Sequence, residues 1–171
     1  MKELILNIEQ WAEDRNIIKG SKPIDQAMKL FSEFGELADN VGKGRDCRDD
    51  VGDVFVVLTI ITKQQGDSVI DFIDESPWDY SHVSCKKSLV EYLCMGLALF
   101  SGEYSDNKAG DCIANLERIC DLHGYTLEEC VQIAYNDIKD RKGILWNGVF
   151  VKESDLSYND CVKSYREFLD E

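Results

Sequence analysis

Two consecutive stripes of apolar residues at helical spacing constrain the fold of this chain most, and both lie between residues 26 and 62. The short, glycine-rich stretch 41–45 separates them and suits a tight connection. Because such a stripe must be buried against another element, the segment predicts two helices packed as an antiparallel hairpin. The first stripe consists of Ala27, Leu30, Phe31, Phe34, Leu37, Ala38 and Val41, and the second of Val54, Val57, Leu58 and Ile61.

Four acidic residues accompany these stripes as two pairs. Glu33 and Glu36 lie beside the first stripe, whereas Asp50 and Asp53 lie on the second stripe, one turn before its apolar residues. Residues three apart are neighbours on a helix, so the hairpin can bring the two pairs face to face. Ionised carboxylates that leave water are costly unless a partner compensates their charge, so this placement requires an explanation.

A divalent cation would explain the placement, because Mg²⁺ prefers oxygen ligands and is bound by one or two carboxylates together with waters. The alternative is a solvated acidic surface, which would be the better interpretation of a single E-x-x-E pair. Two acid pairs on consecutive helices, one of them on an apolar stripe, favour a metal site. We therefore predict that Glu33, Glu36, Asp50 and Asp53 bind Mg²⁺, with Mn²⁺ as a substitute.

The motif SEFGELAD at 32–39, followed by DDVGDVFVVL at 49–58, resembles the MazG-like all-α nucleoside triphosphate pyrophosphohydrolases. That family is marked by E-x-x-E on one helix and E-x-x-D on the next. The segments 11–21 and 134–143 also resemble flanking segments of phage and bacterial members, so the resemblance covers most of the chain before residue 150. Many members carry Glu at the two positions where this chain has Asp50 and Ser32.

The resemblance implies a helical bundle that converts a nucleoside triphosphate, ribo or deoxy, to the monophosphate and pyrophosphate with Mg²⁺. It implies a homodimer or homotetramer. A carboxylate that is not fully committed to the metal, Glu36 or Glu33, could accept the proton of the attacking water. The resemblance also implies that Asn136 and Lys139, which share a helix face, contact the substrate. From the residues alone, that basic helix end could equally serve to complement the helix dipole.

Three further residues are candidate substrate contacts, each with an ordinary alternative. Lys29 could bind phosphate or form an i, i+4 ion pair with Glu33. Arg141 lies at the same basic helix end as Lys139, and its role is left open. Trp11 lies in a segment that resembles the family and could border the base pocket, although packing in the core is the commoner role of such a residue.

Composition narrows the class of protein. The chain of 171 residues predicts one domain, and its net charge of −14 argues against nonspecific binding of DNA, RNA or anionic lipid. A polyphosphate substrate would need bound cations and local basic residues to offset this negative charge.

With no membrane-length apolar stretch and no leader pattern, we expect a soluble cytoplasmic protein, or one of the host cytoplasm if a phage encodes it. Seven cysteines without a C-x-x-C pair predict small core residues in a reducing compartment.

Helical periodicity dominates the chain, so the predicted class is all-α. We expect a helical domain over 1–143, with 144–171 appended as a short hairpin that turns at Asn147-Gly148 and an amphipathic helix. This appendage could pack on its own bundle or on a neighbouring subunit. Besides the central pair, the predicted helices cover 2–14, 69–74, 84–101, 109–122, 126–142 and 158–169. Ser21 is the predicted N-cap of the first central helix, and Thr126 and Glu129 are predicted to form a capping box at the start of the helix 126–142.

The acidic connection 67–81 is longer than most connections, and a surface insertion is favoured over a lid or a partner contact. Its Trp78 and Tyr80 could stack on a base, although such aromatics more often dock a loop onto the core. Two other functions compete with the main hypothesis. One is the related phosphoribosyl-ATP pyrophosphohydrolase, which a substrate panel would distinguish. The other is a noncatalytic acidic helical module that releases no pyrophosphate from any nucleotide.

Overall fold

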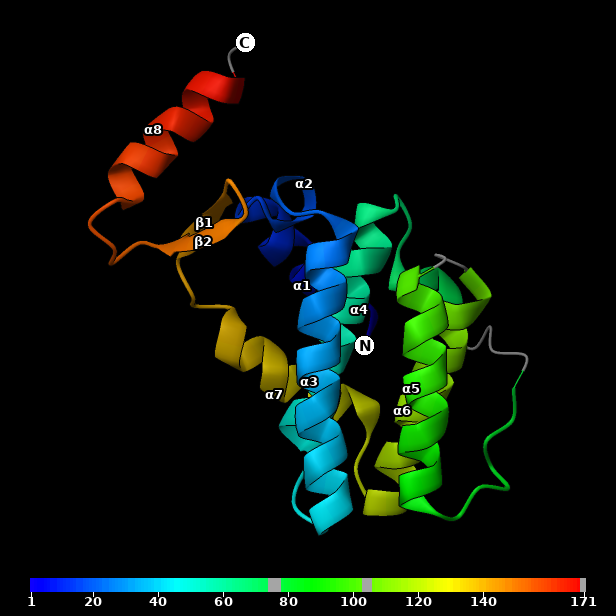
Figure 1. The fold of residues 1–171 in the computed structure, drawn as a ribbon. Coiled ribbons are helices and arrows are strands. Elements are labelled where there is room, and N and C mark those ends of the chain that lie inside the picture. Colours follow the sequence, from blue (N-terminus) through cyan, green and yellow to red (C-terminus); the bar gives the residue numbers. More distant parts are fainter. Residues whose placement is uncertain (74–77, 103–105, 170–171) are drawn as a thin grey trace.

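The structure, a computed structural model, describes residues 1–73, 78–102 and 106–169. The predicted hairpin is present as α3 (Pro23–Lys43) and α4 (Arg48–Gln64). α4 is buried along most of its length, because α3 packs on one side of it and α7 (Leu127–Ile138) on another. A second pair, α5 (Lys86–Gly102) and α6 (Asp106–His123), lies beside this unit with α5 against α3 (Figure 1). The described residues are mostly helical with one short two-stranded sheet, which confirms the predicted helical class.

Two glycines position α4. Gly44 ends α3 at φ +65°, in the left-handed region that costs glycine little, and the chain reverses there into α4. Gly52 lets α4 approach α7 closely. A Cβ at this position would lie 2.7 Å from the Cβ of Ala134 and closer still to the carbonyl of Cys130. The lack of a side chain at Gly52 therefore fixes how near α7 lies to the acids of α4.

The start of α3 lies one residue after the predicted N-cap. Lys22, not Ser21, occupies the N-cap position, and Pro23 begins the helix. The Ser21 hydroxyl donates instead to the carbonyl of Ile17 at 2.7 Å, within the short helix α2 (Ile17–Gly20). The backbone N–H of Lys22 donates to the Asp25 carboxylate at 3.0 Å, which also places a negative charge at the positive end of the helix dipole.

The end of α7 lies several residues before the predicted boundary near Lys142. The helix ends at Ile138, although its predicted capping box at Thr126 and Glu129 is confirmed. The reason lies in α1 (Lys2–Asp14) and the residue that follows it. Arg15 donates from Nε to the carbonyl of Arg141 at 2.6 Å, and from Nη2 to that of Lys139 at 3.2 Å. These bonds satisfy carbonyls at the helix end, so the chain can turn away into a strand.

The predicted hairpin is confirmed as β1 (Gly143–Trp146) and β2 (Val149–Lys152), antiparallel, with Trp146 paired to Val149. Asn147 and Gly148 take the two positive φ values of its turn, +49° and +77°. The hairpin docks on its own bundle. The Leu145 N–H donates to the Arg15 carbonyl at 2.8 Å, and its carbonyl accepts a bond from Asn16 Nδ2 at 2.8 Å.

The C-terminal helix α8 (Tyr158–Leu169) is held mainly by the hairpin, far from α5 and α6 (Figure 1). Trp146 meets Tyr165 and Phe168 edge-on, with ring centroids 5.6 and 5.8 Å apart. In the 67–81 connection, the 3₁₀ helix η1 (Val69–Phe72) occupies part of the predicted helix, whose end at Asp74 lies outside the described residues.

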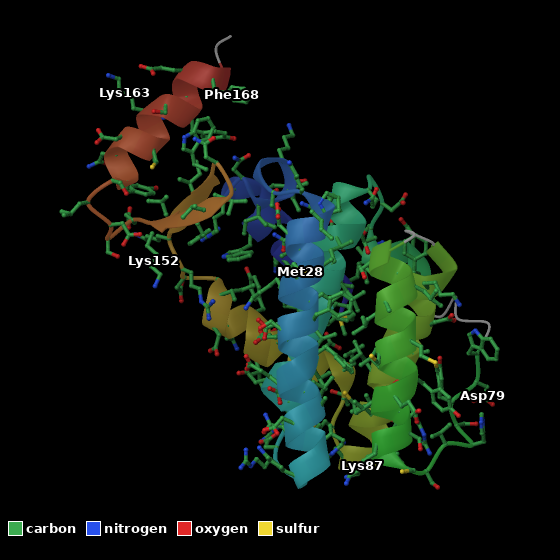
Figure 2. All side chains as sticks on the ribbon, in the orientation of Figure 1. Met28, Asp79, Lys87, Lys152, Lys163 and Phe168 are labelled. Carbon is green, nitrogen blue, oxygen red and sulfur yellow. The ribbon has the colours of Figure 1, made fainter. Side chains whose placement is uncertain are left out.

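Two predictions about burial are wrong. Phe31, assigned to the buried stripe of α3, is 36% exposed, because it lies at helical spacing from two other exposed residues, Ile24 and Met28. Met28 is labelled on α3 in Figure 2. The cysteines are not all core residues, since Cys85 and Cys94 are exposed on the surface near and on α5. Among the described residues, none of the helices is long and apolar enough to cross a bilayer.

Candidate functional site

A cleft of about 400 Å³ opens where α3, α4, the end of α7 and the hairpin meet. Its floor is apolar, formed by Val56, Val57 and Ile60 of α4, and Leu145 and Phe150 of the hairpin form part of its wall. Three of the four predicted metal ligands line it, together with three predicted substrate contacts. These residues are Glu33, Glu36, Asp53, Lys29, Arg141 and Trp11.

Asp53 is the acid whose protonation the site changes most. Its pKa rises from 3.8 to about 7, first because burial penalises the charged form, and then because the charges of Glu33 and Asp49 repel it. Lys29 and Arg141 act in the opposite direction but do not cancel the rise. The cleft therefore brings negative charges together in a partly buried environment, where an added positive charge would be stabilising.

Glu33 is buried, with 5% of its surface exposed, and forms an ion pair with Lys29 one turn earlier on α3. Lys29 thus forms the predicted i, i+4 ion pair with Glu33, and it also lines the cleft. Glu36 lies one turn later and is exposed. No hydrogen bond or ion pair engages Glu36 or Asp53 within the described part of the chain, so both carboxylates can bind a ligand without first breaking a contact.

Asp50, the fourth predicted ligand, is buried but does not line the cleft. Asn40 Nδ2 donates to its carboxylate at 2.8 Å. Burial raises the pKa of Asp50, the bond from Asn40 opposes the rise, and the charges of Asp49, Glu36 and Glu33 add to it. Asp50 therefore shares the electrostatic field of the cluster while its side chain is held by α3.

Asp49 is an acid of this cluster that the sequence prediction missed. Burial raises its pKa, and the charges of Asp137 and Glu33 raise it further, while Arg141 lowers it. Asp49 lies four residues before Asp53, which is the other spacing that places residues on one helix face. That spacing could have identified it. The contribution of Asp137, which is more than 80 residues away in sequence, depends on the packing of α7 against α4.

Trp11 provides an unusual feature of the cleft wall. Its indole Nε1 is buried and has no hydrogen-bond partner among the described residues. The Arg15 guanidinium lies over its ring, 5.0 Å from the centroid, and donates from Nη1 to the Trp11 carbonyl at 3.1 Å. A buried N–H that lacks a partner costs free energy, and an acceptor on a bound ligand would recover it.

Asn136 and Lys139 do share a helix face, but the structure does not bring them into this cleft. Lys139 Nζ donates to the Asn136 side-chain oxygen at 2.8 Å, and Gln132 Nε2 donates to the same oxygen at 3.2 Å. Both residues are exposed and line a separate depression against the start of α1. Arg141, by contrast, lies within the acid cleft.

The donor set fits a hard cation. Glu33, Glu36 and Asp53 offer only oxygen atoms, and burial together with the charges of Glu33 and Asp49 raises the pKa of Asp53 despite the opposing charges of Lys29 and Arg141. In the part of the chain that the structure describes, no three His, Cys, Asp or Glu side chains are arranged as ready ligands of one ion. Lys29 and Asn40 instead hold two of the predicted ligands, Glu33 and Asp50.

Among curated proteins, the chain is similar to an uncharacterized 18.2 kDa protein of Haemophilus phage HP1 (strain HP1c1), from the rep-hol intergenic region. The two are 49% identical over 76 residues, which cover 43% of this chain and 47% of the relative. The chain thus spans about half the length of that curated relative. No family model matches the chain, and no solved structure matches it significantly.

Proposed function

We propose that the protein is a Mg²⁺-dependent nucleoside triphosphate pyrophosphohydrolase of the MazG-like type, acting on a ribo- or deoxynucleotide. The observation that supports this most is the clustering of buried and half-buried carboxylates from two helices in one cleft, with the pKa of Asp53 raised to about 7. Such a cluster is unfavourable by itself and becomes favourable with a bound cation, which is the arrangement that metal-assisted phosphate chemistry requires.

Glu33, Glu36, Asp50 and Asp53 would hold the ion. Bound there, Mg²⁺ would neutralise phosphate oxygens and lower the pKa of a water. Asp53 and Glu36 can serve without losing a contact, whereas Glu33 would exchange its ion pair with Lys29, and Asp50 its bond from Asn40. Lys29, once released from Glu33, would be free to pair with a phosphate.

The chain's own groups suggest how the reaction would proceed. Glu36, exposed at the cleft and without a partner among the described residues, is the carboxylate best suited to accept the proton of the attacking water. As the new oxygen bond to the α-phosphorus forms, the bond to the bridging oxygen of the β-phosphate breaks. Lys29 and Arg141 would offset the charge on the departing pyrophosphate, and the Trp11 N–H would donate to an acceptor on the base or sugar.

We further propose that the protein works as a homodimer or homotetramer in the cytoplasm, that of the host if a phage encodes it. The exposed apolar stripe of Ile24, Met28 and Phe31 on α3 supports an association between copies, because a row of large apolar side chains on a monomer surface is unfavourable. Met28→Glu should then lower the mass measured by light scattering, and an unchanged mass would contradict this interface.

The direct test is pyrophosphate release across ribo- and deoxynucleoside triphosphates, noncanonical bases and phosphoribosyl-ATP, with and without Mg²⁺. We expect release from at least one triphosphate, dependent on Mg²⁺ and abolished by Asp53→Asn. Asp71→Asn, an exposed acid on η1, is the matched control and should retain full activity. Release from phosphoribosyl-ATP alone would favour the related enzyme, and no release from any substrate would favour a noncatalytic module.

A further inference from the structure

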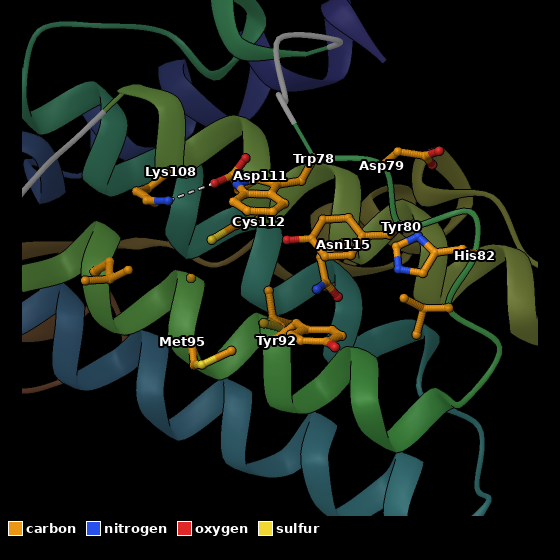
Figure 3. A pocket seen from close by; sticks show the side chains of 14 residues that line it. Trp78, Asp79, Tyr80, His82, Tyr92, Met95, Lys108, Asp111, Cys112 and Asn115 are labelled. Atoms are coloured by element: carbon orange, nitrogen blue, oxygen red, sulfur yellow. Dashed lines mark hydrogen bonds and ion pairs between the residues drawn. The ribbon is translucent and has the colours of Figure 1, made fainter.

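A second cleft, of about 360 Å³, lies between α5, α6 and the segment 78–83, and it shares no lining residue with the acid cleft (Figure 3). Three aromatic rings line it, those of Trp78, Tyr80 and Tyr92. The Tyr80 and Tyr92 rings lie 6.1 Å apart between centroids, at a tilt of 42°. Met95 and Leu99 of α5 add exposed apolar surface at the rim. This is a concave, aromatic surface with room for a small molecule.

Asn115 of α6 makes this cleft unlike an ordinary apolar depression. Its side chain lines the cleft and lies between the Tyr80 and Tyr92 rings in the view of Figure 3, yet only 1% of the residue is exposed. Neither the amide nitrogen nor the amide oxygen makes a hydrogen bond of normal geometry among the described residues, although the Tyr80 side chain lies close enough to interact with the amide. Leaving a buried amide unpaired costs roughly 1–3 kcal/mol per group, so a ligand that pairs with both atoms would bind favourably.

Tyr80 responds to the same environment. Burial raises the pKa of its phenol, and a side-chain hydrogen-bonding interaction with Asn115 opposes that rise. The carboxylates at the cleft are held by the chain itself. Lys108 Nζ donates to Asp111 at 3.1 Å, and the Ser81 N–H donates to Asp79 at 2.8 Å. Asp79 and Asp111 offset the basic side chains Lys108 and His82 that also line the cleft, so on a chain of net charge −14 the cleft favours an uncharged ligand over a phosphate.

We propose that this second cleft binds a nucleobase or nucleoside. A base offers a flat π-face that stacks on aromatic side chains, and its edge carries a donor and an acceptor side by side. The Asn115 amide offers the complementary acceptor and donor, which is the pairing that Asn makes with a base edge. A peptide would need a longer groove to pair its backbone, so the single short chamber favours the base. This proposal does not depend on hydrolysis in the acid cleft.

The test is calorimetric titration of the full chain, without metal, with adenosine, guanosine, cytidine and thymidine and with their 5′-monophosphates. We expect at least one nucleoside to bind, and its monophosphate to bind no more tightly. Asn115→Ala should weaken binding about tenfold or more, and Trp78→Ala roughly 5- to 100-fold. Asn159→Ala and Glu36→Gln, both away from the cleft, should leave the affinity unchanged.

Three results would overturn the proposal. One is no binding of any nucleoside at concentrations up to about 5 mM, where even a Kd of roughly 1 mM would be detected. Another is a monophosphate that binds tenfold tighter than its nucleoside. The third is binding lost in Trp11→Phe or Glu36→Gln but kept in Trp78→Ala, which would place the base in the acid cleft. Should Asn115→Ala lower the melting temperature, Trp78→Ala decides, because Trp78 is 61% exposed and its loss spares the core.

Discussion

The two clefts differ in the kind of polar group that they leave without a full complement of partners, which is a set of carboxylates in one and a neutral amide in the other. In the acid cleft, burial and the repulsion from Glu33 and Asp49 raise the pKa of Asp53 to about 7, and Lys29 and Arg141 do not cancel this rise. The aromatic cleft contains one neutral amide, that of Asn115, which is short of hydrogen-bond partners among the described residues. Unsatisfied charge points to an ion and phosphates, whereas an unsatisfied amide between aromatic rings points to a neutral planar molecule.

The largest expected difference between the clefts concerns Glu36→Gln. Removing the proton acceptor should lower kcat for pyrophosphate release about 10²- to 10⁴-fold. Nucleoside binding in the aromatic cleft should stay the same. Steady-state kinetics measures the first effect and calorimetry the second. Glu91→Gln, an exposed acid on α5, is the control and should leave kcat unaltered. A kcat reduced less than tenfold would remove Glu36 from the role of base.

Gly52→Ala should damage the acid cleft and spare the aromatic one. Alanine is normally the better helix former by about 1 kcal/mol, but here its Cβ would meet Ala134 and the Cys130 backbone. We expect α7 to shift, the free energy of unfolding to fall by about 1–3 kcal/mol, and kcat to decrease. Urea denaturation measures the stability. Gly35→Ala, on the open face of α3, should stabilise the protein instead, and destabilisation of similar size there would contradict the steric explanation.

The pH dependence of stability should isolate Asp53. Because folding raises its pKa from 3.8 to about 7, Asp53 stabilises the folded state when protonated, and that stability is lost as pH rises from about 4 to about 7. In metal-free buffer, Asp53→Asn should therefore gain stability relative to the natural chain over this range, by roughly 1–3 kcal/mol after screening. Chemical denaturation at pH 4, 6 and 8 gives the difference. Mg²⁺ should reverse the order at pH 8, and a difference independent of pH would refute the electrostatic argument.

The smallest expected effect is that of Trp11→Phe, which keeps an aromatic ring and removes the buried N–H. One lost neutral hydrogen bond is worth about 1 kcal/mol, so KM should rise roughly fivefold with little change in kcat. Trp146→Phe, in the hairpin that contacts α8, is the control. An equal rise in KM for both variants would indicate a general loosening of the hairpin rather than a contact to substrate.

Much of the helical hairpin and its acids could be predicted from the sequence, because stripes and acid pairs within one helix depend on local spacing. The same reasoning failed at Phe31, since a stripe of large apolar residues does not reveal which side another helix will cover. The resemblance predicted substrate contacts at Asn136 and Lys139, and the structure places both in a depression separate from the acid cleft. Asn115 was not singled out, because a polar residue among the apolar positions of a helix ordinarily faces water.

By itself, the sequence determined that Glu33 and Glu36 lie three apart on one helix and Asp50 and Asp53 three apart on the next, since periodicity along each helix decides which side chains share a face. Only the tertiary structure decided which groups join them. Arg141 reaches the cleft because Arg15 bonds to the carbonyls at the end of α7 and the chain turns there. Asn115 is enclosed because α5 and the segment 78–83 close over α6. These placements depend on contacts between distant segments, which local spacing does not encode.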